Sequence, residues 1–227
     1  MPGFAFPADT QAFLADLREH NDRAWFEANR DRYQSAYVAA GKAFVEAVSP
    51  LLRAIVPGIR AEPRVLGSIF RINRDTRFSA DKRPYKDHLD LWFWEGDRKG
   101  AVSGLFVRVS PDLVGIGAGA HGFDKPTLAR YREKVADPDA GPELLDIVKT
   151  LDAAGYDLGG ETYARTPRGF DVSPDTARLL RHSALFVHHD EPPALATDAG
   201  NLVGVLGKHW TTIVPLHRWL VTHLQGN

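Results

Sequence analysis

The sequence contains no cysteine and a single methionine among its 227 residues. A chain without cysteine cannot form a disulfide, a thiolate metal site or a cysteine nucleophile. Any metal site would have to use histidine, aspartate or glutamate side chains. The absence of cysteine therefore removes several classes of site before any motif is considered.

Long apolar runs are also missing, and no stretch approaches the length needed to span a bilayer. Residues 1–9 show no basic cluster followed by an apolar segment, which is the pattern of an export signal. We therefore expect a cytoplasmic protein without a membrane partner.

The chain has almost no net charge, with a formal value of −1 at pH 7. Proteins that coat nucleic acid through their overall field are usually strongly basic, so this balance argues against such a role. Apolar residues at 44% and charged residues at 25% are ordinary for a folded protein. The length fits one core, and without repeats or a linker we expect a single domain over residues 1–227.

Two helices are expected in the first third of the chain. Asp9 or Thr10 can cap the first helix and Asn21 can cap the second. Helical spacing of apolar residues supports this, and the buried face of the first helix would carry Phe13, Leu14 and Leu17.

Strand patterns follow, at residues 65–72, 89–94, 102–109 and 113–116. The turns between the last three are too short for parallel crossovers, which favours an antiparallel meander. Trp92 and Trp94 would lie on one face of their strand and Phe93 on the other, as in a sheet covered on both sides.

Helical patterns return at residues 125–135, 143–153 and 174–181, followed by a helical tail broken by Pro215. The sequence therefore predicts an α+β fold, in which a central, largely antiparallel sheet is flanked by N-terminal and C-terminal helices.

The chemistry concentrates between residues 71 and 86, where the chain leaves a strand pattern and enters a loop. Six cations lie there against Asp75 and Asp81: Arg71, Arg74, Arg77, Lys82, Arg83 and Lys86. The window carries +4, so the remainder of the chain carries −5. Guanidinium groups match carboxylate or phosphate oxygens bidentately, and lysine adds a movable point charge. The surplus charge predicts an anionic partner.

The candidate anion-binding residues are Arg71, Arg74, Arg77, Lys82 and Lys86. Asp75 and Tyr85 are the candidates for proton transfer. Pairing with a neighbouring arginine would lower the pKa of Asp75 and weaken it as a base, and Tyr85 can equally pack its ring beneath the loop.

The pattern Arg-x-x-Arg-Asp-x-Arg-Phe at residues 71–78, followed by Asp-Lys-x-x-Tyr at residues 81–85, resembles the signature of an uncharacterised bacterial family, domain of unknown function 2461. The segment 20–26 with Tyr33 is similar to the helix start of that family, although Ala24 replaces its usual glutamate. The resemblance covers nearly the whole chain and marks Arg23, Trp25 and Asp81 as supporting residues. It implies no established reaction.

Two alternatives compete with an anion site. The arginines could instead form an ion-pair network that joins the sheet to the first helices through Asp22, Glu27 or Asp31, although desolvation makes buried pairs a costly way to stabilise a fold. Phe70 and Phe78 beside the cations could stack on a base, but we expect both in the core.

Two further patterns carry less weight. Residues 117–122 read Gly-x-Gly-x-x-Gly, but without a βαβ unit we expect a glycine-rich turn there rather than a dinucleotide site. His188, His189 and Asp190, like the triplet 88–90, lack a compelling third ligand, so no metal is predicted and no cofactor is assigned. His209, His217 and His223 are expected to be satisfied surface or core imidazoles.

The sequence thus predicts an anion-binding domain, with an enzyme acting on a phosphorylated small molecule or nucleotide as one form of it. A binding module for a nucleic-acid backbone or an acidic protein segment would use the same cations without a catalytic acid or base. A structural Arg/Asp motif is the third possibility.

Overall fold

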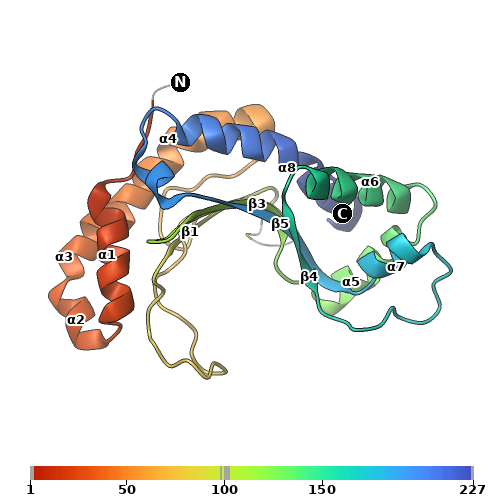
Figure 1. Cartoon of the computed structure of the whole chain (residues 1–227), viewed down its shortest axis with the longest axis horizontal. Helices are drawn as coiled ribbons and strands as arrows, with labels where there is room; N and C mark the ends of the chain where they lie inside the picture. The colour runs from red at the N-terminus through yellow and green to blue at the C-terminus, as the bar shows by residue number, and fades with distance from the viewer. Residues whose placement is uncertain (1–2, 98, 100–102, 226–227) are drawn as a thin grey trace. The chain divides into compact units, whose positions relative to one another are not determined.

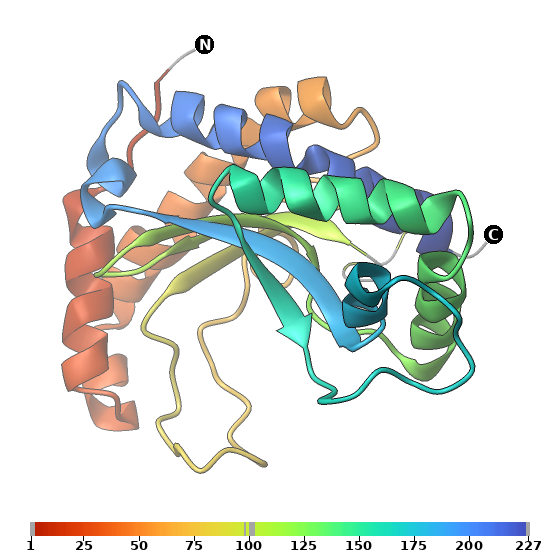
Figure 2. The same cartoon turned by 45° about the vertical axis from the view of Figure 1, so that its right-hand side comes forward.

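The computed structural model of the chain describes residues 3–97, 99 and 103–225. Figures 1 and 2 show its helices and strands in two views. The helical elements are α1 (Ala8–Glu19), α2 (Arg23–Ala28), α3 (Arg30–Arg32), η1 (Tyr33–Ala39), α4 (Ala40–Ile55), α5 (Lys125–Val135), α6 (Ala140–Ala153), α7 (Pro174–Leu179), η2 (Pro193–Thr197) and α8 (Leu202–Leu224). The strands are β1 (Leu89–Trp94), β2 (Gly104–Val109), β3 (Val114–Ala120), β4 (Asp157–Glu161) and β5 (His182–Glu191).

The strands form a sheet in the order β1-β2-β3-β5-β4. The first three strands are neighbours both in the chain and in the sheet, so the antiparallel meander predicted from the short turns is confirmed. β4 and β5 also run antiparallel, with Asp157 opposite His188. Helices before and after the strands confirm the α+β class.

Contacts within the chain divide it into two compact units. The first comprises Met1–Phe93, Phe106–Ile116 and Asp190–Lys208, and the second comprises Trp94–Leu105, Gly117–His189 and His209–Asn227. Large buried side chains lie in each, among them Phe44 in the first unit and Trp219 in the second. The single domain over residues 1–227 stays a prediction.

The first helix has the predicted buried face, since Phe13, Leu14 and Leu17 are fully buried. Its predicted cap is wrong, because α1 begins at Ala8, after Pro7. Thr10 is buried inside the helix and its hydroxyl donates to the Ala36 carbonyl at 2.7 Å.

The cap of α2 is Asp22 rather than the predicted Asn21. The Asp22 carboxylate accepts a hydrogen bond from the Trp25 backbone amide at 2.9 Å. The Asn21 side chain instead forms hydrogen bonds with the backbone of Tyr85.

The predicted strand at residues 65–72 is wrong. Only isolated bridges form there, from Val65 to Ile69 and from Ile69 to Leu91. A tight turn replaces the strand: the Leu66 amide donates to the Ile69 carbonyl at 2.8 Å, and Leu66 itself has a positive φ of 68°. β1 and α5 have the predicted bounds, whereas β2 begins at Gly104, and Val102 lies outside the described residues.

The glycine-rich stretch is not the predicted turn, because its first four residues, 117–120, belong to β3. Gly119 has a positive φ of 136°, and a side chain there would collide with the Leu185 carbonyl of the neighbouring strand β5. Close approach of two backbones thus explains the glycine, and a phosphate cradle is not needed to explain it.

The tail is one helix, because Pro215 lies inside α8 and does not break it as predicted. Ile213, Leu216 and Leu220 on either side of the proline are fully buried, so packing holds the helix across the missing amide. The sequence patterns did not identify β4 and β5, and β5 contains His188, His189 and Asp190, which were considered only as metal ligands. No helix in the described part of the chain is long and apolar enough to cross a membrane.

Candidate functional site

The cationic segment forms a loop closed by two arms of backbone that pair with each other. The Arg74 amide donates to the Pro84 carbonyl at 2.8 Å, and the Lys86 amide donates to the Ile72 carbonyl at 2.8 Å. A further bridge joins Asn73 to Tyr85. Residues 71–83, which we call the basic loop, therefore extend away from β1 (Figures 1 and 2, yellow segment before β1).

The base of the basic loop is fastened to the helices by Asn21. Its side-chain amide donates to the Tyr85 carbonyl at 3.1 Å and accepts from the Tyr85 amide at 3.0 Å. The Tyr85 ring stacks on Phe26 with centroids 4.2 Å apart, and burial raises the pKa of its hydroxyl. This geometry gives Tyr85 a packing role and does not favour the proton transfer considered from the sequence.

Asp81 organises the far arm of the loop by pairing with two arginines. Its Oδ2 atom accepts from Arg74 at 2.7 Å and from Arg83 at 2.8 Å. The hydrogen bonds from Arg83, followed by those from Arg74, hold the pKa of Asp81 well below its ordinary value. Two cations therefore share one carboxylate.

Asp75 is engaged by Arg77, two residues further on. Arg77 Nη2 lies 2.6 Å from Asp75 Oδ2, and Arg77 Nε lies 2.9 Å from Oδ1. These hydrogen bonds hold the pKa of Asp75 below its ordinary value, which makes this exposed carboxylate a weak base. The pairing expected from the sequence is present, and the geometry does not favour proton transfer by Asp75.

Two cations of the basic loop have no carboxylate bound to them in the described part of the chain. Lys82 Nζ donates only to the Thr76 carbonyl, at 3.0 Å. Arg71 is exposed and makes no hydrogen bond or ion pair with any described residue, although its charge reaches Asp75. With Arg74, Arg77 and Arg83, the loop carries five cations against two carboxylates.

Phe78 belongs to this loop, and its predicted place in the core is wrong. The residue is 94% exposed, and the Arg77 guanidinium carbon lies 5.7 Å from its ring centroid. The strand predicted at residues 65–72, which would have alternated its side chain inward, does not form. Phe70, also expected in the core, is only half-buried, and Lys86 Nζ lies 4.8 Å from its ring centroid.

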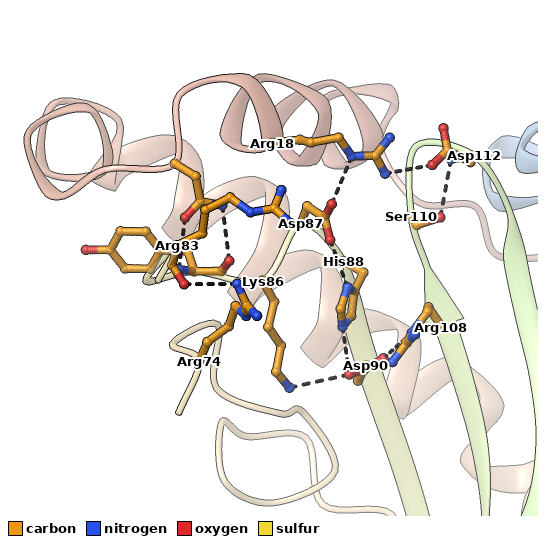
Figure 3. A network of polar contacts seen from close by, with 12 residues as sticks. Arg18, Arg74, Arg83, Lys86, Asp87, His88, Asp90, Arg108, Ser110 and Asp112 are labelled. Carbon is orange, nitrogen blue, oxygen red and sulfur yellow. Dashed lines mark hydrogen bonds and ion pairs between the residues drawn. The ribbon is translucent and has the colours of Figure 1, made fainter. Parts of the chain in front are cut away.

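Lys86 belongs to a different group of charges, the Asp90 cluster, which Figure 3 shows from close by. Asp90 on β1 accepts from Arg108 Nε on β2 at 2.7 Å, and it lies 3.2 Å from His88 Nε2 and 3.4 Å from Lys86 Nζ. Burial alone would raise the pKa of Asp90, but the contacts from His88 and Arg108 outweigh it and hold that pKa well below its ordinary value.

The Asp90 cluster continues to the first helix through His88 and Asp87. His88 Nδ1 lies 3.0 Å from Asp87, and Asp87 accepts from Arg18 at 2.9 Å. Arg18 also contacts Asp112 at 2.7 Å.

The charges of the Asp90 cluster balance without a ligand. The cluster has three carboxylates, those of Asp87, Asp90 and Asp112. They face three permanent cations, which are Arg18, Lys86 and Arg108. Of the residues in the Asp90 cluster, only Lys86 was predicted from the sequence as a binding residue. The triplet 88–90 was considered for metal binding alone. The alternation of His88 and Asp90 around Leu89 was the available signal, because in an extended chain it puts both side chains on the same side. No pattern in the sequence pointed to Arg18 or Arg108.

The supporting residues of the second helix lie apart from these ion pairs. Arg23 is exposed at the first position of α2. Its positive charge acts to lower the pKa values of Glu27 and Tyr85. Trp25 is half-buried against Phe13, with ring centroids 5.9 Å apart. The alternative network, through Asp22, Glu27 or Asp31 to the arginines of the basic loop, does not form among the described residues.

A second buried polar group lies in the second unit, around His217. His217 is fully buried, its Nδ1 lies 2.9 Å from the Ser103 hydroxyl and its Nε2 lies 3.0 Å from Glu95. The hydrogen bond from His217 holds the pKa of Glu95 below its ordinary value. This is the satisfied core imidazole predicted for the tail, and with Ser103 only 3% exposed it is a structural group.

The second unit also contains a groove of about 730 Å³ between α6 and α8. Its charged lining consists of Glu143 and Asp146 facing Arg218 and His223. His223 Nε2 lies 3.7 Å from Glu143, so part of this charge is already paired. The groove has no excess of positive charge, and the surplus on the chain stays with the basic loop.

The comparisons with known proteins agree with the resemblance seen in the motif. The model of the family described as "Conserved hypothetical protein (DUF2461)" matches residues 9–219, so the chain belongs to that family. No curated protein matches the chain.

Proposed function

We propose that this member of the DUF2461 family binds an anionic group, phosphate or carboxylate, on its basic loop. The observation that carries the proposal is the charge surplus of the loop, five cations against two carboxylates, with Arg71 and Lys82 bound to neither carboxylate. Like charges held in one short segment repel unless an anion or solvent separates them. An anionic ligand would relieve that repulsion.

The ion pairs already in the loop support ligand binding because they are exposed. The side chains of Arg77 and Arg83 are 77% and 51% exposed, and exposed ion pairs contribute only about 0 to 1 kcal/mol. Their guanidinium groups can therefore turn towards ligand oxygens at small cost. Arg74, at 25% exposure and with a further bond to the Arg83 carbonyl, fixes the shape of the loop instead.

The Asp90 cluster is assigned a structural role in this proposal. It balances its own charges, and Lys86 is held between Asp90 and the Phe70 ring. Asp75 and Tyr85 are both engaged elsewhere, so the proposal is one of binding, without an assigned reaction. The five predicted anion-binding residues thus divide into Arg71, Lys82 and Arg77 as ligand contacts and Arg74 and Lys86 as supports.

Thermal unfolding in the presence of anions tests the proposal, because a ligand that prefers the folded state raises the melting temperature. The wild type, Arg71→Gln and Lys82→Gln would be melted with inorganic phosphate, pyrophosphate, citrate, sugar phosphates and nucleotides. Lys149→Gln is the matched control, since it removes one lysine from an exposed pair with Asp175 in the second unit.

At least one anion should stabilise the wild type and Lys149→Gln, and it should stabilise Arg71→Gln and Lys82→Gln much less. All four proteins should melt alike without ligand, because neither loop cation contributes a carboxylate contact. Equal stabilisation of all four proteins, or of none by any anion, would contradict the proposal.

A further inference from the structure

Phe78 places a bare aromatic ring inside the most basic segment of the chain. The residue is 94% exposed, and its neighbour Arg77 is itself 77% exposed. A single exposed apolar residue needs no explanation by itself. An exposed ring with cations before and after it along a loop can contact a ligand that has both an aromatic face and anionic groups.

Single-stranded nucleic acid is a ligand of this kind. Proteins that bind single strands combine cations that follow the backbone with aromatic side chains on which bases stack. Arg71 and Lys82 have no carboxylate to release before binding phosphate. The exposed ring of Phe78 offers a face to a base, and Arg77 lies 5.7 Å from that ring, where its charge can reach an adjoining phosphate.

A free nucleotide fits this surface less well than a strand. Small-molecule sites are concave and bury most of the ligand. A ring that is 94% exposed lies in no such cavity. A strand can lie across a protruding loop, because each nucleotide needs only one contact with a base or phosphate.

We propose that the basic loop binds single-stranded nucleic acid, with Phe78 stacking on a base and Arg71, Arg77 and Lys82 contacting phosphates. This inference rests on the proposed function and names the class of anion. The overall charge of −1 confines the interaction to this loop, so binding depends on few phosphates. Two or three phosphate contacts correspond to about a tenfold loss of affinity between about 50 and 200 mM salt.

Two other occupants fit the loop less well. A membrane surface would require several apolar side chains to insert, and the nearest uncharged residues along the chain from Phe78, Thr76, Ser79 and Ala80, are small. An acidic protein segment would use the cations but has no need of an exposed ring. Stacking is the interaction that separates a nucleic acid from both.

Fluorescence anisotropy with a labelled oligothymidylate of about ten nucleotides tests the inference. Phe78→Leu keeps an apolar side chain but removes the ring, and should weaken binding about tenfold. Phe78→Trp keeps a stacking face and should bind at least as tightly as the wild type. Tyr163→Leu is the matched control, since Tyr163 is 41% exposed in the second unit and has the Arg132 guanidinium carbon 4.9 Å from its ring.

The outcomes separate this inference from the proposed function. If pyrophosphate stabilises Phe78→Leu as it does the wild type while oligothymidylate binding falls and Phe78→Trp restores it, both proposals are supported. If Phe78→Leu binds oligothymidylate as tightly as the wild type, or if polyglutamate or phosphatidylserine vesicles bind as tightly as the oligonucleotide, the stacking inference is overturned and anion binding stands. If neither the oligonucleotide nor any anion binds, both are overturned.

Discussion

Replacing Asp90 by asparagine removes the negative charge that three side chains contact, with little change of volume. Arg108, His88 and Lys86 lie 2.7, 3.2 and 3.4 Å from the carboxylate. The Asp90 side chain is 18% exposed, so water can replace the lost charge only in part. Breaking a buried ion pair from one side costs about 3 to 5 kcal/mol. Because Asp90 keeps some contact with solvent, we expect the lower end, about 3 kcal/mol.

Thermal and urea unfolding measure this change. In a chain of this length 1 kcal/mol corresponds to about 2 to 4 °C, so Asp90→Asn should melt about 6 to 12 °C below the wild type. Asp175→Asn is the matched control, since Asp175 is 60% exposed and, among the described residues, pairs with Lys149 alone, at 2.7 Å. The control should lose less than about 1 kcal/mol.

The dependence on pH follows from the low pKa of Asp90 in the folded chain. A carboxylate whose pKa is lower in the folded than in the unfolded state stabilises the fold above its unfolded pKa of about 4, and this stabilisation is lost as the pH falls through the folded pKa. The difference between the wild type and Asp90→Asn should therefore be full near neutral pH and narrow below about pH 4. An Asp90→Asn variant as stable as Asp175→Asn at neutral pH would refute the structural role of the cluster.

Three smaller changes have equally definite outcomes. Asn21→Ala removes both hydrogen bonds to the Tyr85 backbone and should cost about 1 to 2 kcal/mol in urea unfolding; no loss would mean that the clamp does not stabilise the loop. Glu95→Gln removes the charge facing buried His217 and should cost about 1 to 3 kcal/mol, a difference that narrows below about pH 4.5 because the folded pKa of Glu95 is lowered; a gap unchanged at pH 3 would contradict this. Gly119→Ala should lower the melting temperature by several degrees, because the new methyl group meets the backbone of β5; an unchanged melting curve would show that the strands can separate.

Local patterns were sufficient to predict much of the fold. Alternation around Phe93 identified β1, and helical spacing identified α5 and the buried face of α1. Both signals arise within a few residues, since the side chains of one element share a face at a fixed period. The basic loop was found in the same way, as six cations in one short window.

The errors arise where distant contacts override local preference. Val65 to Ile72 has the composition of a strand, but the hydrogen bonds of Ser68 and Leu66 fold it into a turn. Phe78 follows a strand-like pattern and yet stays in solvent, because the chain turns outward before it. The pairing of Arg18 with Asp87 joins residues 69 positions apart, and no spacing in the sequence encodes it.

Mapping amide chemical shifts by NMR during a titration with pyrophosphate tests the central claim most directly, because it locates the anion on the chain. The account predicts saturable changes concentrated in the basic loop, residues 71–83, and their loss in Arg71→Gln. Saturable changes confined to other residues, or none at all with pyrophosphate and with oligothymidylate, would contradict the assignment of the loop as an anion-binding site.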